Sequence, residues 1–236
     1  MFARRFALVI SIVFCGSLAL AAAAVAAGGM GPGKYTFHST GANAFFGMGK
    51  KGGPPTASWS VSVNQGLNSF KPSQPSGPRI VSDSTMVFVT EFDATGKGGY
   101  GCFIVPDGDF NVSRDLQSAT LHATLTADEA CPGYGKPVGS GKDVAYAGGN
   151  SGLALPITVN VTWGATGAVT TYKNTFSIQC LDYVEDGSST NQSSGAGAGG
   201  SISALGGQFT SEFADINSTD GKLNISGMLA AGCFGY

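Results

Sequence analysis

Residues 157–163 read ITVNVTW, and apolar and polar side chains alternate along them without a break. Successive side chains of a β-strand point to opposite faces of a sheet. The isoleucine, both valines and Trp163 would therefore share one face, and the two threonines and Asn160 would share the other. The stretch predicts a strand with one face in the core and one face in water.

The same rhythm recurs along the chain. Residues 57–63 read ASWSVSV and place Trp59 among the inward residues, and residues 118–126 place His122 on the outward face. Residues 86–92 are apolar on both faces, which suits a central strand. No window after the N-terminal segment has apolar residues at helical spacing. Further strands are expected at 85–92, 101–105, 170–181, 208–216 and 222–229.

Turn signals separate these strands and predict how they connect. Clusters of Gly, Asp, Thr and Ser at 107–109, 164–167 and 218–221 are typical of hairpin connections. Residues 186–207 hold mainly Gly, Ser, Ala and Asn with little to bury, which predicts a long flexible loop. We expect an all-β fold: an antiparallel two-sheet β-sandwich of the jelly-roll or immunoglobulin-like type, preceded by an N-terminal signal helix.

The N-terminal segment predicts export. Arg4 and Arg5 precede an almost uninterrupted apolar run, and Ala24 and Ala26 suit a signal peptidase. Residues 1–26 are expected to be a cleaved signal peptide, with an uncleaved membrane anchor as the alternative. The remaining 27–236 would form one secreted, extracellular domain. Without the two arginines the chain has 11 basic and 15 acidic residues, a mild charge that disfavours nucleic acid as a partner.

Four cysteines remain after cleavage: Cys102, Cys131, Cys180 and Cys233. An even number in an exported chain indicates two disulfide bonds, for which three pairings are possible. Proximity in sequence favours Cys102 with Cys131 and Cys180 with Cys233. Their spacing matches no zinc motif, and no histidine lies near them in sequence, so no metal or other cofactor is expected.

A resemblance follows from three stretches: ASWS at 57–60, DFNV at 109–112 leading to LQSATL at 116–121, and VNVTWGATG at 159–167. Together they resemble a group of uncharacterised secreted bacterial β-proteins, in which a Val-x-Val-x-Trp strand enters a Thr-Gly turn. The resemblance covers most of residues 57–229 and implies a similar strand order. It implies no activity and no site residues, and the cysteines and residues 186–207 depart from it.

Carboxylates are the first candidates for chemistry. Glu91 and Asp93 would share a strand face at a spacing of roughly 7 Å, within the range of glycosidase pairs. Glu212 could join them, which would make the protein a secreted carbohydrate-active hydrolase. Asp107 and Asp109 could bind calcium, but a turn explains them with fewer assumptions, because calcium takes six or more oxygens. Asp215, on the face of Phe209 and Phe213, is expected at a strand end or paired.

Other catalytic patterns are absent from the sequence. Only His38 and His122 could serve as bases, and no nucleophile elbow, phosphate-cradling loop or metalloprotease motif is found. Trp59 and Trp163 follow core parity, whereas Tyr100 and Tyr134 lie in Gly-rich stretches and are the candidate ligand contacts. The sequence therefore favours a non-enzymatic secreted protein with a structural or interaction role, which could bind carbohydrate or an extracellular protein.

Overall fold

The computed structural model describes residues 32–48, 57–72, 80–95, 98–131, 136–138, 145–147, 150–211 and 213–227. The predicted signal helix at 1–26 lies outside them. The described chain is all-β, with short 3₁₀ turns η1 (Asp107–Asp109), η2 (Ala127–Glu129) and η3 (Ser203–Leu205). The strands are β1 (Gly33–Met48), β2 (Ala57–Pro72), β3 (Ile80–Asp93), β4 (Gly98–Val105), β5 (Phe110–Val112), β6 (Ser118–Leu125), β7 (Lys136–Val138), β8 (Ala145–Ala147), β9 (Asn150–Ser151), β10 (Ile157–Ala165), β11 (Thr170–Cys180), β12 (Tyr183–Ile202), β13 (Gly207–Thr210) and β14 (Phe213–Ser226).

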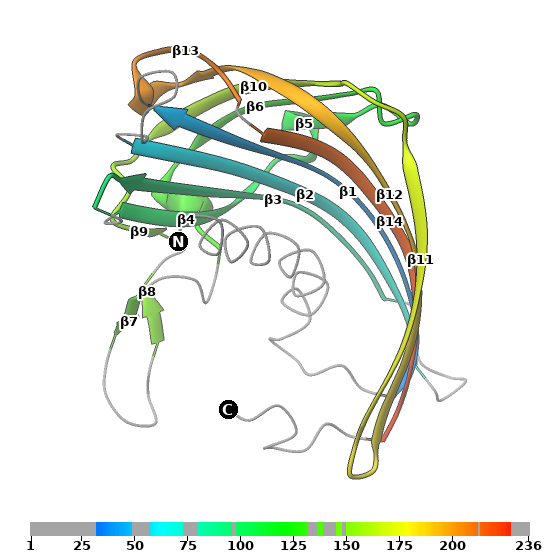
Figure 1. The fold of residues 1–236 in the computed structure, drawn as a ribbon. Coiled ribbons are helices and arrows are strands. Elements are labelled where there is room, and N and C mark those ends of the chain that lie inside the picture. Colours follow the sequence, from blue (N-terminus) through cyan, green and yellow to red (C-terminus); the bar gives the residue numbers. More distant parts are fainter. Residues whose placement is uncertain are drawn as a thin grey trace.

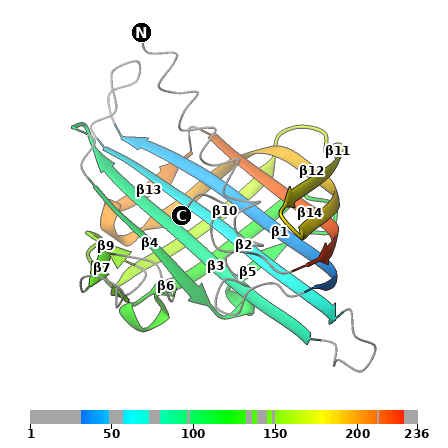
Figure 2. The ribbon, with the colours of Figure 1, turned by 90° about the horizontal axis from the view of Figure 1, so that it is seen from below.

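Twelve of these strands form one antiparallel sheet, in the order β5-β6-β10-β12-β14-β1-β2-β3-β4-β9. Strands β11 and β13 also pair with β12, and β7 and β8 form a separate hairpin. Figure 1 shows that β10, β6 and β5 cross above β1 to β4, while the long strands curve down to one side. Figure 2 shows β4, β3, β2 and β1 side by side.

The predicted strands 57–63 and 157–163 are confirmed as parts of β2 and β10, and the predicted strand 118–126 is β6, which ends one residue earlier at Leu125. Their inward residues are buried except Ala57, which is partly exposed, and Trp59 and Trp163 are 2% and 0% exposed. The indole Nε1 of Trp163 donates a hydrogen bond of 2.8 Å to the carbonyl oxygen of Asn43, so its polar atom is satisfied in the core. Alternation was thus sufficient to place these side chains.

The all-β prediction is confirmed, but the described residues show one large continuous sheet and the small β7–β8 hairpin, and not the predicted sandwich of two packed sheets. Long strands can bend and coil, so a single sheet covers the main core from both sides. At the far ends of the sheet path, β4 comes close to the segment after β6. The backbone N–H of Cys131 donates to the carbonyl of Cys102 at 2.9 Å, and Phe103 forms a β-bridge with Ala130.

Strand β12 occupies most of the segment 186–207 that composition predicted as a flexible loop. It has partners along both edges: β11 and then β10 on one side, β14 and then β13 on the other. Backbone hydrogen bonds from these four strands hold a segment whose own side chains bury little. Tertiary pairing therefore overrides the composition of this segment.

Two of the expected hairpin turns have other roles. Residues 218–221 lie inside β14 and pair with β1 and β12. Residues 164–167 lie at the break between β10 and β11, which pair in succession with the same edge of β12. There the hydroxyl of Ser194 donates to the carbonyl oxygen of Gly167, which ties β12 to the break. The turn at 107–109 is the 3₁₀ turn η1 between β4 and β5, and these two strands do not pair with each other.

Candidate binding face of the long sheet

The two faces of the sheet are buried at opposite ends of the same strands. In β1 the residues of the main core are Ala42, Ala44 and Phe46, whereas Tyr35 packs in a separate second cluster with Phe37 against it. The register between β1 and its neighbours is continuous, so odd and even positions keep opposite faces throughout. Strand β14 behaves likewise, with Ile216 in the main core and Ile225 in the second cluster.

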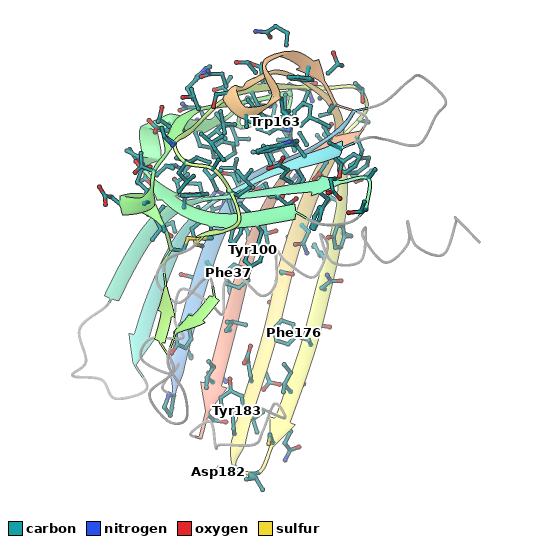
Figure 3. The ribbon with its side chains drawn as sticks, turned by 90° about the vertical axis from the view of Figure 1, so that its left-hand side faces the viewer. Phe37, Tyr100, Trp163, Phe176, Asp182 and Tyr183 are labelled. Carbon is teal, nitrogen blue, oxygen red and sulfur yellow. A yellow bond between two sulfur atoms is a disulfide. The ribbon has the colours of Figure 1, made fainter. Side chains whose placement is uncertain are left out.

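We call the face that packs the main core the core face, and the opposite face, which carries Tyr35, Phe37, Asn43 and Asp215, the concave face. The second name follows from the curve of the long strands, which bend away from the main core (Figure 1). Figure 3 looks toward the hollow side of this curve and shows Trp163 in the closely packed upper part. Phe37, Phe176 and Tyr183 lie along the lower part of the long strands.

A polar band runs across the middle of the concave face. Asp215 of β14 accepts hydrogen bonds from the amide Nδ2 of Asn43 at 3.0 Å and from the Nδ2 of Asn217 at 3.0 Å. Burial raises the pKa of Asp215, and the two amide donors partly offset that rise. In the described residues this carboxylate is paired with amides and not with a cation. It can therefore still accept hydrogen bonds from a neutral ligand.

The band continues onto β12. The hydroxyl of Thr219 donates to the Oδ1 of Asn191 at 2.9 Å, and the Nδ2 of Asn191 donates to the hydroxyl of Ser189 at 3.0 Å. Toward β3, the hydroxyls of Ser60 and Thr90 bond to each other. The middle of the concave face thus presents amides and hydroxyls held in fixed orientations by their neighbours.

Exposed apolar side chains gather on this face. Among the described residues, eight large hydrophobic side chains are exposed. The strand register places six of the eight on the concave face, because partners across antiparallel strands share a face. Leu67 lies on the core face instead, and Leu181 lies in the turn between β11 and β12. The six are Phe92, Tyr100, Ile104, Tyr172, Ile178 and Phe213.

The predicted ligand contact Tyr100 is 42% exposed and lies on the concave face of β4, opposite Thr90 of β3. The other predicted contact, Tyr134, lies outside the described residues. Tyr172 has the same kind of position at the other side of the polar band, where it pairs with Asn191. The two exposed tyrosines therefore flank the band from opposite sides of the long sheet.

Of the carboxylates in the hydrolase hypothesis, Glu91 and Asp93 occupy odd positions of β3 and share its core face, as their spacing predicts. Asp93 accepts hydrogen bonds from the backbone N–H and the hydroxyl of Thr95 at 2.8 and 2.7 Å, which is the geometry of a turn. Glu91 lies opposite Trp59 on the core face. Glu212 lies outside the described residues. Asp215 lies within β14 on the concave face, and its carboxylate is hydrogen-bonded to Asn43. Of the two positions predicted for Asp215, a strand end or a paired site, the structure shows the paired site.

A second polar group lies on the outward faces of β6 and β10. His122, Asn160, Asp109 and Glu129 line an open hollow of about 390 Å³. The His122 Nδ1 lies 3.2 Å from the Oδ1 of Asn160, and Glu129 closes a capping box by accepting from the backbone N–H of Thr126 at 2.9 Å. These contacts give His122 and Glu129 local structural roles.

The described part of the chain does not bring metal ligands together. It contains no group of three or more His, Cys, Asp or Glu side chains placed to hold a metal ion. None of its helices is long and apolar enough to cross a membrane.

The predicted disulfide between Cys102 and Cys131 is present. Cys180 is also disulfide-bonded, while its predicted partner Cys233 lies outside the described residues.

Sequence reasoning missed the concave face because it missed β1. The signal was available: Tyr35 and Phe37 alternate at odd positions, while Ala42, Ala44 and Phe46 alternate at even positions. A change of parity inside one strand indicates that opposite faces are buried at its two ends.

No protein-family model matches the chain, and no curated protein matches it. Among solved structures, an acetoacetate decarboxylase-like enzyme from Sphingomonas wittichii RW1 is 8% identical, with 85% of this chain and 94% of that chain covered, at a TM-score of 0.26. The translocator domain of autotransporter NalP from Neisseria meningitidis is 9% identical over 91% and 96% of the two chains, at a TM-score of 0.18. Likenesses at these scores carry no argument about fold or function, so this chain is characterised by its own all-β sheet.

Proposed function

We propose that this is an exported, non-enzymatic binding protein whose concave face recognises carbohydrate. The observation that carries the proposal is the arrangement of that face, where exposed aromatic side chains flank a band of oriented amides and hydroxyls. Six of the eight exposed large hydrophobic side chains lie on this face, and a concentration of exposed apolar side chains on one face indicates an interaction site.

Carbohydrate suits this chemistry better than other small ligands. The apolar C–H faces of a sugar ring pack on aromatic rings such as Tyr100 and Tyr172, and its hydroxyls both donate and accept hydrogen bonds. Asn43, Asn217 and Asp215 offer complementary donors and acceptors, and no described cation on this face would select an anionic ligand. A few oriented polar groups among apolar ones are typical of a ligand site.

Export is supported by the disulfide between Cys102 and Cys131, because such bonds persist in oxidising compartments. The predicted signal peptide is consistent with this. An exported protein can encounter polysaccharide outside the cell, and the extended concave face could contact several sugar units of such a polymer at once.

The test is binding to an array of neutral and acidic glycans by the wild-type protein and two variants. Tyr172→Ala and Leu67→Ala form a matched pair, because both side chains are 45% exposed but lie on opposite faces. We expect Tyr172→Ala to weaken binding at least tenfold, which corresponds to about 1.4 kcal/mol, and Leu67→Ala to leave it unchanged.

Equal binding by both variants would refute the concave face as the site. The hydrolase alternative has its own readout: release of reducing sugar from a bound glycan that Glu91→Gln abolishes. Binding without such release supports the non-enzymatic function.

A further inference from the structure

Strand β11 forms an open edge of the sheet. It pairs with β12 along its whole length, and among the described strands no other one pairs along its second edge. Every residue of β11 except Phe176 and Cys180 is exposed. Figure 1 shows β11 on the outer side of the long strands. Alternate residues of such a strand direct backbone N–H and C=O groups away from the sheet, so this edge can accept a further strand.

The ends of the described sheet path are short or covered. Strand β5 at one end has three residues. Strand β4 near the other end pairs with β9 and is bridged to Ala130. Proteins commonly protect an edge strand with proline, a bulge or charged side chains, but β11 reads TTYKNTFSIQC and holds one charge, Lys173. Strand β11 is therefore well suited to pairing with a strand of another chain.

Two exposed apolar side chains lie at equal distances from the centre of β11 on its concave face. Tyr172 is 45% exposed and Ile178 is 36% exposed, and each lies three residues from Thr175. If a second copy of β11 pairs antiparallel about a two-fold axis at Thr175, Tyr172 of each copy lies opposite Ile178 of the other. An aromatic and a β-branched side chain in such a pair stabilise the sheet. Their outer ends stay open on the concave face.

The same register brings opposite charges together on the core face. Lys173 of one copy would lie opposite Ser177 of the other, and Ser177 lies opposite Asp186 of its own β12. Strands lie about 5 Å apart, so Lys173 and Asp186 would be about 10 Å apart at Cα with only a small serine between them. The flexible lysine side chain can span this gap, and the two-fold axis makes the contact twice. In the described part of the chain neither Lys173 nor Asp186 forms an ion pair.

Shifted registers lose this charge match. With the axis at Asn174, Lys173 lies opposite Thr175, whose neighbour in β12 is Ser188. With the axis at Phe176, Lys173 lies opposite residue 179, whose neighbour is residue 184, a valine. An axis at Lys173 places two like charges opposite each other, which is destabilising. Both faces of β11 therefore favour the axis at Thr175.

We infer that two copies of this chain pair through β11, antiparallel about Thr175, and form a symmetric dimer with one continuous sheet. The paired stretch covers residues 171–179, and Cys180 lies beyond it. The interface is short, so we expect a weak dimer with a dissociation constant of about 10–100 µM. This inference does not depend on what the concave face binds, because strand pairing and the charged contacts do not involve a ligand.

The first test is sedimentation equilibrium of the purified protein at concentrations below and above this dissociation constant. We expect the mass to rise from that of one chain to that of two. Lys173→Glu and Asp186→Lys should each weaken the dimer at least tenfold, because each places like charges side by side. The two substitutions together should restore the dissociation constant to within about threefold of wild type. Lys222→Glu, at an exposed site of β14, is the control for the change in net charge and should leave the dimer unchanged.

Three outcomes of this test would overturn the interface. The first is a protein that stays monomeric at every concentration. The second is a dimer that neither single charge reversal weakens. The third is a combined variant that stays as weak as the single ones, which would show that Lys173 and Asp186 do not meet.

The second test measures the register by cross-linking. Thr175→Cys places a thiol opposite its own copy, and the two Cα atoms of an antiparallel pair lie about 4.5–5.5 Å apart, within the range of a disulfide. Thr171→Cys is the matched control, because it is an exposed threonine on the same face of the same strand. Its copy would lie eight residues away along the pair, about 26 Å.

Under mild oxidation, non-reducing electrophoresis should show covalent dimers of Thr175→Cys forming at least tenfold faster than those of Thr171→Cys. Equal rates for the two variants would indicate random collision and would refute the register. Faster cross-linking of Thr171→Cys would place the axis elsewhere and would refute it as well.

Discussion

The main core and the second cluster are built from the same long strands but on opposite faces. In the main core the sheet folds back so that β6 and β10 cover β1 to β4, and both walls of the core come from one sheet. The second cluster has a single wall. The comparison shows that one curved sheet can bury side chains between two of its own walls in one region and against a single wall in another. The two regions should therefore respond differently to substitution.

The largest effect is expected from Trp163→Ala in the main core. Truncation of this fully buried side chain leaves a cavity that two walls cannot collapse to fill, and it leaves the Asn43 carbonyl without its indole donor. We expect the free energy of unfolding in urea to fall by about 3–5 kcal/mol. Leu67→Ala, at an exposed site, should change it by less than about 0.5 kcal/mol. A loss at Trp163 no larger than at Leu67 would contradict the description of the main core.

The next effect concerns the disulfide between Cys102 and Cys131. Cys102 in β4 and Cys131 after η2 are 29 residues apart in sequence, and their bond joins the two ends of the curled sheet. Replacement of both by serine should lower the free energy of unfolding by about 3 kcal/mol, since the unfolded chain gains freedom. An unchanged urea midpoint would show that this bond does not stabilise the main core.

A smaller effect is expected in the second cluster. Ile225→Ala should cost about 2 kcal/mol in the wild-type protein, because Ile225 is only 2% exposed. The cost should stay below that of Trp163→Ala, because the second cluster has a single wall. Urea unfolding of both variants measures the difference. Equal costs would contradict this order of the two regions.

The smallest effect is expected at Asp215, between the two regions. Burial raises its pKa above 3.8, so the folded protein binds this proton more tightly than the unfolded chain. The stability that this group contributes is therefore present at low pH and is lost as pH rises through the raised pKa. Asp215→Asn cannot titrate, so wild type should gain stability relative to the variant as pH falls from 7 toward 4.

Urea unfolding at several pH values checks this, with Asp186→Asn, at an exposed site on neighbouring β12, as the control. A parallel pH profile for wild type and Asp215→Asn would contradict the raised pKa.

Alternation predicted the parts of the fold in which local pattern and tertiary environment agree. Trp59 and Trp163 are buried because, along the whole of each predicted strand, one face carries polar side chains and the other carries apolar ones. The disulfide between Cys102 and Cys131 follows from their proximity in sequence. Tyr100 was singled out as an aromatic in a Gly-rich stretch, and it lies exposed on the concave face.

The rest depended on partners that are distant in sequence. Residues 186–202 have the composition of a loop and form a strand because four other strands supply hydrogen bonds along both edges. Residues 218–221 have the composition of a turn and stay extended because β1 and β12 pair on either side of them. The turn-forming side chains stabilise a turn less than the backbone hydrogen bonds to two neighbouring strands stabilise the extended segment.

By itself the sequence determined that the chain forms strands, which side chains of three strands point inward, and which cysteines are near enough in sequence to bond. Those properties depend on the two-residue period of a strand and on chain distance, which are local. Only the tertiary structure decided that one sheet curls around the main core, and that the opposite face of the same strands carries the polar band and the second cluster. Curvature and strand order arise from pairing between segments far apart in the chain, which no local pattern records.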